Sequence, residues 1–215
     1  MVDLSHPIEA GMTTYPGLPG PVISTHISRQ ESGARLGTGV SFHIGRIELV
    51  ANTGTYVDAP YHVDADGVDV SGLPLERLVG VPVVVVRASG RTAVGAELLA
   101  DPSALWGTAV LVHTGWSRHW GTPAYLSGSP YLTGGFAAAV VEANVAVLGI
   151  DALNVDNIED LSRPVHHTML SHGIPLIEHL TNLDRIPDRG ARLTALPAPV
   201  RGLGTFPVRA VAVLP

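Results

Sequence analysis

Short apolar runs, separated by turn-forming residues, dominate the hydropathy pattern of this sequence. Residues 81–86 form a β-branched run interrupted only by Pro82, and 109–112 form a second run of the same kind. Runs of this length without polar alternation predict strands that are buried on both faces of a sheet. An alanine-rich stretch of helical length, 134–144, leads directly into another apolar run at 145–150. A helix followed by a buried strand is typical of α/β layer packing.

Four other segments carry weaker patterns. Residues 43–50 alternate apolar and polar positions, which predicts a strand with one solvated face. Residues 94–100 have a helical composition, and 202–214 predict a final core strand. Residues 3–21 contain four prolines and three glycines, a density that excludes long regular structure. We therefore expect 1–21 to form an ordered N-terminal arm with tight turns.

The segment 164–183 combines secondary-structure signals with four histidines and a glutamate. Its pattern predicts a short helix ending at Gly173, a strand over 174–177 and a second helical turn that begins near Glu178. There is no internal repeat and no linker long enough to divide the chain. We therefore expect 1–215 to form a single domain.

Composition narrows the classes of partner and of chemistry. The 215 residues are 46% apolar and carry a net charge of −6 without any basic run. A globular fold is therefore expected, and neither nucleic acid nor a membrane surface is an expected partner. There is no cysteine, which excludes a thiol nucleophile and cysteine-ligated metals. All thirteen basic residues are arginine, so a Schiff-base lysine and a P-loop are also excluded. A small-molecule substrate remains the expected partner.

The sequence also gives an expectation about location. Residues 1–7 lack a charged region followed by an apolar core, as a secretory signal would have. No stretch approaches the roughly 18 uninterrupted apolar residues of a membrane-spanning helix. We therefore expect a cytoplasmic protein.

Residues with chemical potential concentrate at 52–62, which reads Asn-Thr-Gly-Thr-Tyr-Val-Asp-Ala-Pro-Tyr-His. A divalent cation needs imidazole and carboxylate ligands that converge from separate segments. Asp58 from this segment, with His166 and Glu178, supplies one imidazole and two carboxylates, the ligand type of zinc or manganese sites. His62 is then free to carry protons near neutral pH. The competing interpretation of this stretch is a polar turn without chemical function.

Two other candidates are weaker. Asp151 follows the predicted strand at 145–150, where α/β sheets commonly place functional groups, but a structural carboxylate that accepts backbone hydrogen bonds is the favoured interpretation. A nucleophilic serine is not favoured, because the sequence contains no Gly-x-Ser-x-Gly motif.

Several stretches together resemble a known family. In chain order they are Asp3-Leu-Ser-His-Pro-Ile, Gly11-Met-Thr-Thr-Tyr-Pro-Gly, 52–62, Thr114-Gly-Trp, Leu148-Gly-Ile-Asp, 166–178 and Leu203-Gly-Thr-Phe-Pro-Val-Arg-Ala. They are similar to the putative cyclase family, which includes bacterial kynurenine formamidases and isatin hydrolases. The resemblance spans nearly the whole chain. It implies one α/β domain with a central mixed β-sheet and surrounding helices, of the swivelling β/β/α type, and it implies a homo-oligomer.

The family's central motif, His-x-Gly-Thr-His-x-Asp-x-Pro-x-His, is only partly retained. The matching residues are Gly54, Thr55, Asp58, Pro60 and His62. Asn52 and Tyr56 stand where the family has metal-binding histidines, whereas His166 and Glu178 match its remaining ligands at the same twelve-residue separation. A carboxamide oxygen is a weak zinc ligand, and a tyrosine must first lose its proton. One position of a two-metal site should therefore be weakened or missing.

Three interpretations remain open from the sequence. The first is a hydrolase that cleaves an amide, lactam or ester of a small cyclic or aromatic substrate and uses one zinc or manganese ion. The second is a metal-free site, with Tyr56 and His62 as acid and base, that cyclises, dehydrates or isomerises a polyketide-like or enolisable compound of secondary metabolism. The third is a non-catalytic protein that binds a small molecule.

The catalytic interpretations assign roles to specific residues. The predicted catalytic residues are His62, Asp58 and Tyr56, the predicted substrate-binding residues are Tyr15, Asn52 and Tyr56, and the predicted metal ligands are Asp58, His166 and Glu178. In this scheme His62 takes and returns the proton, and Asn52 or Tyr56 donates a hydrogen bond to the developing oxyanion. The leading hypothesis is the hydrolase.

Overall fold

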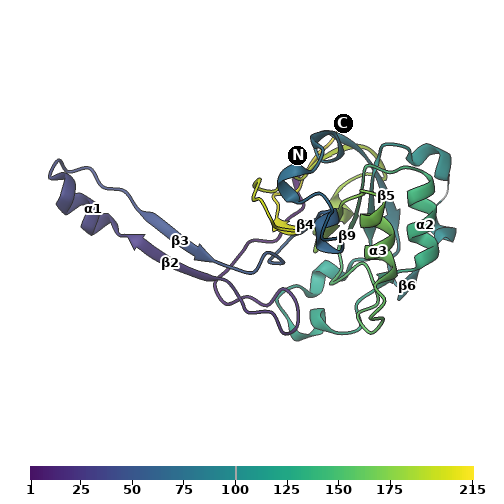
Figure 1. Cartoon of the computed structure of the whole chain (residues 1–215), viewed down its shortest axis with the longest axis horizontal. Coiled ribbons are helices and arrows are strands. Elements are labelled where there is room, and N and C mark those ends of the chain that lie inside the picture. Colours follow the sequence, from purple (N-terminus) through teal and green to yellow (C-terminus); the bar gives the residue numbers. More distant parts are fainter. Residues whose placement is uncertain (100) are drawn as a thin grey trace.

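A mixed β-sheet organises the chain, which we describe from a computed structural model covering residues 1–99 and 101–215 (Figure 1). In spatial order its nine strands are β1 (Val2–Asp3), β13 (Val211–Val213), β11 (Arg189–Thr194), β5 (Val81–Arg87), β7 (Ala109–His113), β9 (Val147–Ile150), β10 (Leu176–Glu178), β4 (Tyr56–Asp58) and β12 (Thr205–Pro207). Strands β5, β7, β9 and β10 are parallel, and their neighbours on either side are antiparallel. The predicted α/β class with a mixed central sheet is confirmed.

Both faces of the parallel strands are covered by apolar side chains. On one face Val84 and Val110 pack in a cluster with helices α2 (Gly134–Glu142) and α3 (Pro164–Ser171). On the other face the alternate residues of the same strands join a second cluster with Leu4. This double burial explains the uninterrupted apolar runs. The strands predicted at 81–86, 109–112 and 145–150 and the helix predicted at 134–144 are confirmed.

Two predicted helical segments are wrong. The region 94–100 contains only a 3₁₀ turn, Ala96–Leu98, and Ala100 lies outside the described residues. Val94 belongs to strand β6 (Ala93–Val94), which pairs with β8 (Tyr131–Leu132). Too few residues therefore remain for a helix. The turn expected from Glu178 does not form either. His179 takes a left-handed φ of 56°, which ends regular structure there.

The helix and strand predicted within 164–177 do form, as α3 and β10. The C-terminal segment differs from its prediction, because it contains two short strands rather than one. β12 pairs with β4 and β13 pairs with β11, so the two strands lie far apart in the strand order of the sheet. The first of them borders the candidate site, and the second lies next to the edge strand β1.

A long hairpin, 22–48, projects from the body of the molecule (Figure 1). It consists of β2 (Val22–Ile27), α1 (Arg29–Leu36) and β3 (Ile44–Glu48), and within residues 1–99 and 101–215 β2 pairs only with β3. The strand predicted at 43–50 is present, but the prediction of one buried face is wrong, since all five residues of β3 are exposed. We call 22–48 the protruding hairpin.

Residues 1–21 lie against the body. Strand β1 pairs with β13, Leu4 is fully buried, and the Gly11 backbone N–H donates to the Pro21 carbonyl. These contacts turn the segment back towards the sheet and bring Tyr15 to the cavity described below. No helix in 1–99 or 101–215 combines the length and hydropathy needed to cross a membrane.

Candidate active site

Strand register brings the candidate groups of the site together. β4 lies between β10 and β12, with Tyr56 opposite Glu178 and Asp58 opposite Thr205. Directly opposed residues of antiparallel strands present their side chains on the same face of the sheet. Accordingly the Tyr56 hydroxyl donates to Glu178 Oε2 at 2.5 Å, and the Thr205 hydroxyl donates to Asp58 Oδ1. Two carboxylates are thus fixed by hydroxyl donors from the neighbouring strands.

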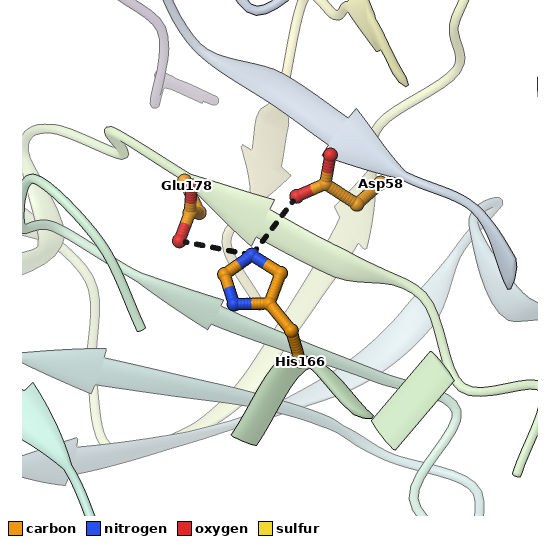
Figure 2. A group of neighbouring side chains, drawn as sticks. All are labelled: Asp58, His166 and Glu178. Atoms are coloured by element: carbon orange, nitrogen blue, oxygen red, sulfur yellow. Dashed lines mark ion pairs between the residues drawn. The ribbon is translucent and has the colours of Figure 1, made fainter. Parts of the chain in front are cut away.

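Asp58, His166 and Glu178 converge at one buried point (Figure 2). His166 Nε2 lies 3.8 Å from Asp58 Oδ2 and 3.7 Å from Glu178 Oε1, and one ligand atom of each residue lies within 4.8 Å of the others. All three side chains are buried. The sequence prediction that these residues meet is therefore correct in geometry. They come from β4, from the first turn of α3 and from the end of β10.

Three consecutive residues, Asn154, Val155 and Asp156, each hold one group of the site. Asn154 Oδ1 accepts from Arg163 Nη1, and the Val155 backbone N–H donates to Glu178 Oε1 at 2.6 Å. Asp156 Oδ2 lies 2.6 Å from His166 Nδ1, and both Asp156 carboxylate oxygens also accept backbone N–H groups at the start of α3. This tripeptide therefore couples α3 to β10.

The Asp156 contact fixes which nitrogen of His166 faces the cluster. A carboxylate accepts the Nδ1 proton, so Nε2 is the nitrogen that faces Asp58 and Glu178. A lone pair and two carboxylate oxygens facing one another repel unless a cation or a proton lies between them. Burial opposes a charged imidazole, but the hydrogen bond to Asp156 and the two facing carboxylates raise the pKa of His166 to about 10. Burial raises the pKa of Glu178 to about 7, although His166 opposes this shift.

The donor set fits one divalent cation. Asp58 Oδ2 is buried and has no hydrogen-bond partner among the described residues, as expected of an atom whose partner is an ion. Two ligand atoms that share an ion at about 2.1 Å can lie up to about 4.2 Å apart, which the two His166 distances satisfy, and all three ligand atoms lie within 4.8 Å of one another. One imidazole and two carboxylates suit zinc or manganese. Asp156, bonded to the ligating histidine, completes the outer shell that such sites need.

His62 joins the cluster through Thr205. The single Thr205 hydroxyl proton goes to Asp58, so the 3.1 Å contact to His62 Nδ1 requires an Nδ1–H donor. The Nε2 lone pair of His62 is therefore the free one. Its side chain is 35% exposed, whereas that of Asp58 is fully buried. Gly204 makes the approach possible, because a Cβ there would lie 2.6 Å from the His62 backbone.

A cavity of about 320 Å³ opens beside these groups. Its lining residues are Tyr15, Leu18, Asn52, Tyr56, His62, Val63, Asn154, Arg163, His166, His167 and Glu178. The volume suits a small molecule with one or two rings. All three predicted substrate-binding residues, Tyr15, Asn52 and Tyr56, lie on its wall.

The hydroxyl of Tyr56 is already engaged. Burial and the charges of Glu178 and Asp58 raise the pKa of Tyr56 well above its usual value, so the side chain is a neutral phenol. Its one proton is donated to Glu178. Asn52, which is only half-buried, is thus the freer of the two predicted oxyanion donors. Tyr56 acts on the site chiefly by positioning Glu178.

Sequence reasoning missed Thr205, Asp156, Asn154 and Arg163. For Asn154 and Asp156 the available sequence signal was a polar residue within the mainly apolar stretch that follows Asp151, and both side chains are buried in the structure. Asp151 itself has the favoured structural role, since its oxygens accept from the Thr114 hydroxyl and from two backbone N–H groups.

Two further histidines lie beside the site without polar contacts at Nε2. The Nε2 atoms of His6 and His179 are buried and have no partner among the described residues, and His6 stacks on Trp120 at 4.0 Å. Burial lowers the pKa of His6 from 6.5 to about 4. The neutral ring is thus favoured in the folded state, and the unfolded chain binds the extra proton first as pH falls.

This difference predicts an acid-sensitive contribution to stability. The free energy of unfolding should fall as pH drops from about 6.5 towards 4, because His6 binds a proton in the unfolded state and stays neutral in the folded state. His6→Phe keeps the stacking and removes the titration. We therefore expect the unfolding free energy of the variant to fall by about 1 to 2 kcal/mol less than that of the wild type, a figure reduced for the partial exposure of His6. Urea unfolding of both proteins at pH 7.5 and pH 4.5 measures it. Equal falls would show that His6 does not contribute.

The comparisons with known proteins identify the family and agree with this fold. The putative cyclase family model matches residues 2–157. The chain belongs to the putative cyclase family. It is 30% identical over 210 residues to a kynurenine formamidase of Bacillus mycoides, covering 98% of this chain and 95% of the relative. The family match ends before His166, and the similarity to the relative extends over nearly the whole chain.

Solved structures show the same architecture. Isatin hydrolase A from Labrenzia aggregata has a TM-score of 0.83 at 23% identity, covering 99% of this chain and 93% of that one. A structure described as a potential metal-dependent hydrolase with cyclase activity has a TM-score of 0.80 at 25% identity, covering 98% and 96%. The prediction of an enzyme among the hydrolases of the cyclase family is confirmed by these relatives.

Proposed function

We propose that this cyclase-family hydrolase cleaves a carbonyl–nitrogen bond, an aryl formamide or a lactam, in a small aromatic substrate, with one divalent metal ion at Asp58, His166 and Glu178. The observation that carries the proposal is the buried Asp58 Oδ2, which has no hydrogen-bond partner among the described residues and faces His166 Nε2 at 3.8 Å. The similarity to proteins named kynurenine formamidase and isatin hydrolase supports the substrate class.

The protein's own groups divide the work of hydrolysis. When bound, a zinc or manganese ion supplies Lewis acidity towards a carbonyl oxygen and lowers the pKa of a nearby water. His62 Nε2 accepts a proton from the attacking water and returns it to the leaving nitrogen. Asn52 donates a hydrogen bond to the carbonyl oxygen as negative charge develops there. Thr205 holds His62 in the tautomer that this role requires.

Product mass tests the proposal against a metal-free cyclase or isomerase. Formanilide and isatin are incubated with protein purified without a histidine tag, and products are weighed by mass spectrometry. Hydrolysis adds the mass of one water, whereas cyclisation or isomerisation does not. We expect turnover that chelation with EDTA abolishes and that zinc or manganese restores. Full turnover in chelated, metal-free protein would contradict the metal-dependent mechanism.

The protruding hairpin supports the expectation that the protein forms a homo-oligomer. An isolated two-stranded ribbon is marginally stable in water, yet this one exposes Val22, Ile23, Val40, Phe42, Ile44 and Ile47. The hairpin 22–48 contributes a net +1 through three arginines and two glutamates, so the rest of the chain contributes −7 to the total of −6. This charge complementarity favours a second copy of the same chain as the covering partner.

Light scattering measures that assembly directly. We expect a dimer or larger oligomer at micromolar concentration, and a shift towards monomer when Ile23, Phe42 and Ile47 are replaced together by serine. A monomeric wild-type protein would contradict the assembly without affecting the proposed chemistry.

A further inference from the structure

Arg163 is the arginine among the cavity-lining residues, and its charge is not paired with a carboxylate. No ion pair among the described residues includes it. Instead Nη1 donates to the Asn154 side-chain oxygen and Nη2 donates to the Tyr15 hydroxyl, both at 3.1 Å. A guanidinium has five N–H donors, and these contacts use two. Its other N–H donors have no partner among these contacts. Arg163 is thus a charged side chain that two neutral groups, Asn154 and Tyr15, hold at the cavity wall.

The backbone at Arg163 is strained to present this side chain. Its φ of 47° and ψ of 55° are left-handed, a conformation that non-glycine residues rarely take, and the next residue is Pro164. Such strain persists where surrounding contacts hold it, and it is concentrated at ligand-binding positions. Here the holding contacts are Tyr15 from the N-terminal segment and Asn154 from the tripeptide that also fixes the metal-ligand candidates.

Other positive groups near Arg163 are already used. The first backbone N–H groups of α3, at Val165 and His166, donate to Asp156, so the start of this helix is not free for an anion. His166 faces Asp58 and Glu178. Arg163 is therefore the permanently charged side chain of the cavity that remains available to a ligand, and the imidazoles of His62 and His167 are further basic groups on its wall.

We propose that Arg163 binds an anionic substituent, a carboxylate, of the substrate whose carbonyl reacts at the metal-ligand cluster. The apolar body of such a molecule lies against Leu18, Val63 and the Tyr15 ring. The assignment of the reacting carbonyl rests on the proposed function, whereas the binding of an anion by Arg163 can be measured without turnover. The inference narrows the substrate class from small aromatic amides to those that carry a carboxylate.

Matched substrate pairs test the inference. Formamidobenzoates with the carboxylate at the ortho, meta or para position are compared with the isosteric formamidobenzamides, on wild-type enzyme and on Arg163→Gln. At one ring position or more we expect wild-type kcat/KM to favour the carboxylate. Arg163→Gln should lower kcat/KM for that carboxylate about 10- to 100-fold, mainly through KM, and change the uncharged partner by less than about 3-fold.

Controls separate recognition from structural damage. Arg91→Gln removes the same charge from an exposed position outside the cavity and should leave both substrates unaffected. Arg163→Lys keeps the charge but loses the planar donor arrangement, so it should keep part of the carboxylate preference. Because the measured quantity is a ratio between two substrates, a general loosening of the site lowers both rates and leaves the ratio unchanged. An unchanged ratio in Arg163→Gln would overturn the inference.

A binding measurement makes the result independent of catalysis. Isothermal titration calorimetry compares aminobenzoates with aminobenzamides on both proteins. If no formamide is hydrolysed but an aminobenzoate binds at least about 10-fold more weakly to Arg163→Gln, the proposed reaction fails and the anion site stands. If formamides are hydrolysed without dependence on Arg163, the reaction stands and the anion site fails. Carboxylate binding that is equal in both proteins, as on a metal ion alone, also overturns it.

Discussion

Replacing His62 with alanine is expected to lower kcat about 100- to 10,000-fold, the loss typical of a missing general acid–base, with little change in KM. The expectation follows from the free Nε2 lone pair that the Thr205 contact leaves on His62 at the cavity wall. Steady-state kinetics on formanilide measure the effect, and added imidazole should restore part of the rate. His172→Ala, at an exposed histidine outside the cavity, is the matched control.

The Thr205 bridge gives a finer test of the same role. Thr205→Val removes the hydroxyl that donates to Asp58 and accepts from His62, and it keeps the shape of the side chain. We expect a loss of about 10- to 100-fold, as for other groups that orient ligands and bases, and near-normal activity in Thr205→Ser. If His62→Ala retains full kcat, proton transfer lies elsewhere and His62 is not the general acid–base of the site.

Asp58→Asn is expected to reduce bound metal from about one ion per chain to near zero and to abolish metal-dependent turnover. The variant replaces an anionic ligand oxygen with a weak neutral one at the buried Oδ2 position. Elemental analysis of protein purified without a histidine tag measures the stoichiometry. Asp184→Asn, which removes an equal charge from an exposed position, should bind metal normally.

Folding of the Asp58 variant can be followed separately from metal binding. The metal-free wild type holds two buried carboxylates near one imidazole, so removing one negative charge should not destabilise it strongly. Metal at 100-fold its Kd should stabilise the wild type by about 2.7 kcal/mol and leave Asp58→Asn unchanged. Equal stabilisation of both proteins would place the ion outside the cluster.

Candidate residues of the site could be named from the sequence, but the contacts that orient them could not. Asp58, His62, His166 and Glu178 could be proposed because their residue types suit metal binding or proton transfer and because they match motif positions of the family that the sequence resembles. Their orienting partners could not be identified, because Thr205 lies 147 residues from Asp58 and meets it only through the register of β4 and β12. Register between distant strands depends on the whole sheet and not on local pattern.

The fold errors have equally local causes. The alternation at 43–50 correctly predicts a strand, but a single chain offers no surface to cover β3, so its apolar positions are exposed. The helix expected from Glu178 fails because His179 adopts a left-handed conformation. Tyr56 was expected to face the substrate, and it does line the cavity, but its hydroxyl proton is committed to Glu178. Composition alone does not indicate whether the Tyr56 hydroxyl donates its proton to a substrate or to Glu178.

Asn52 and Tyr56 remain the two departures from the family motif. Tyr56 now has a physical role, because a neutral phenol at this position holds Glu178 through a hydrogen bond. The departure is therefore compatible with a site for one ion and not for two. Asn52 keeps a polar group on the cavity wall where a second ligand would otherwise lie.

The position of the ion is the central claim, and anomalous X-ray diffraction tests it most directly. Crystals of active, untagged protein are measured on both sides of the zinc and manganese absorption edges. The account predicts one anomalous peak per chain, about 2.0 to 2.2 Å from Asp58 Oδ2, His166 Nε2 and Glu178 Oε1. The absence of any peak between these three atoms in fully active protein would contradict it.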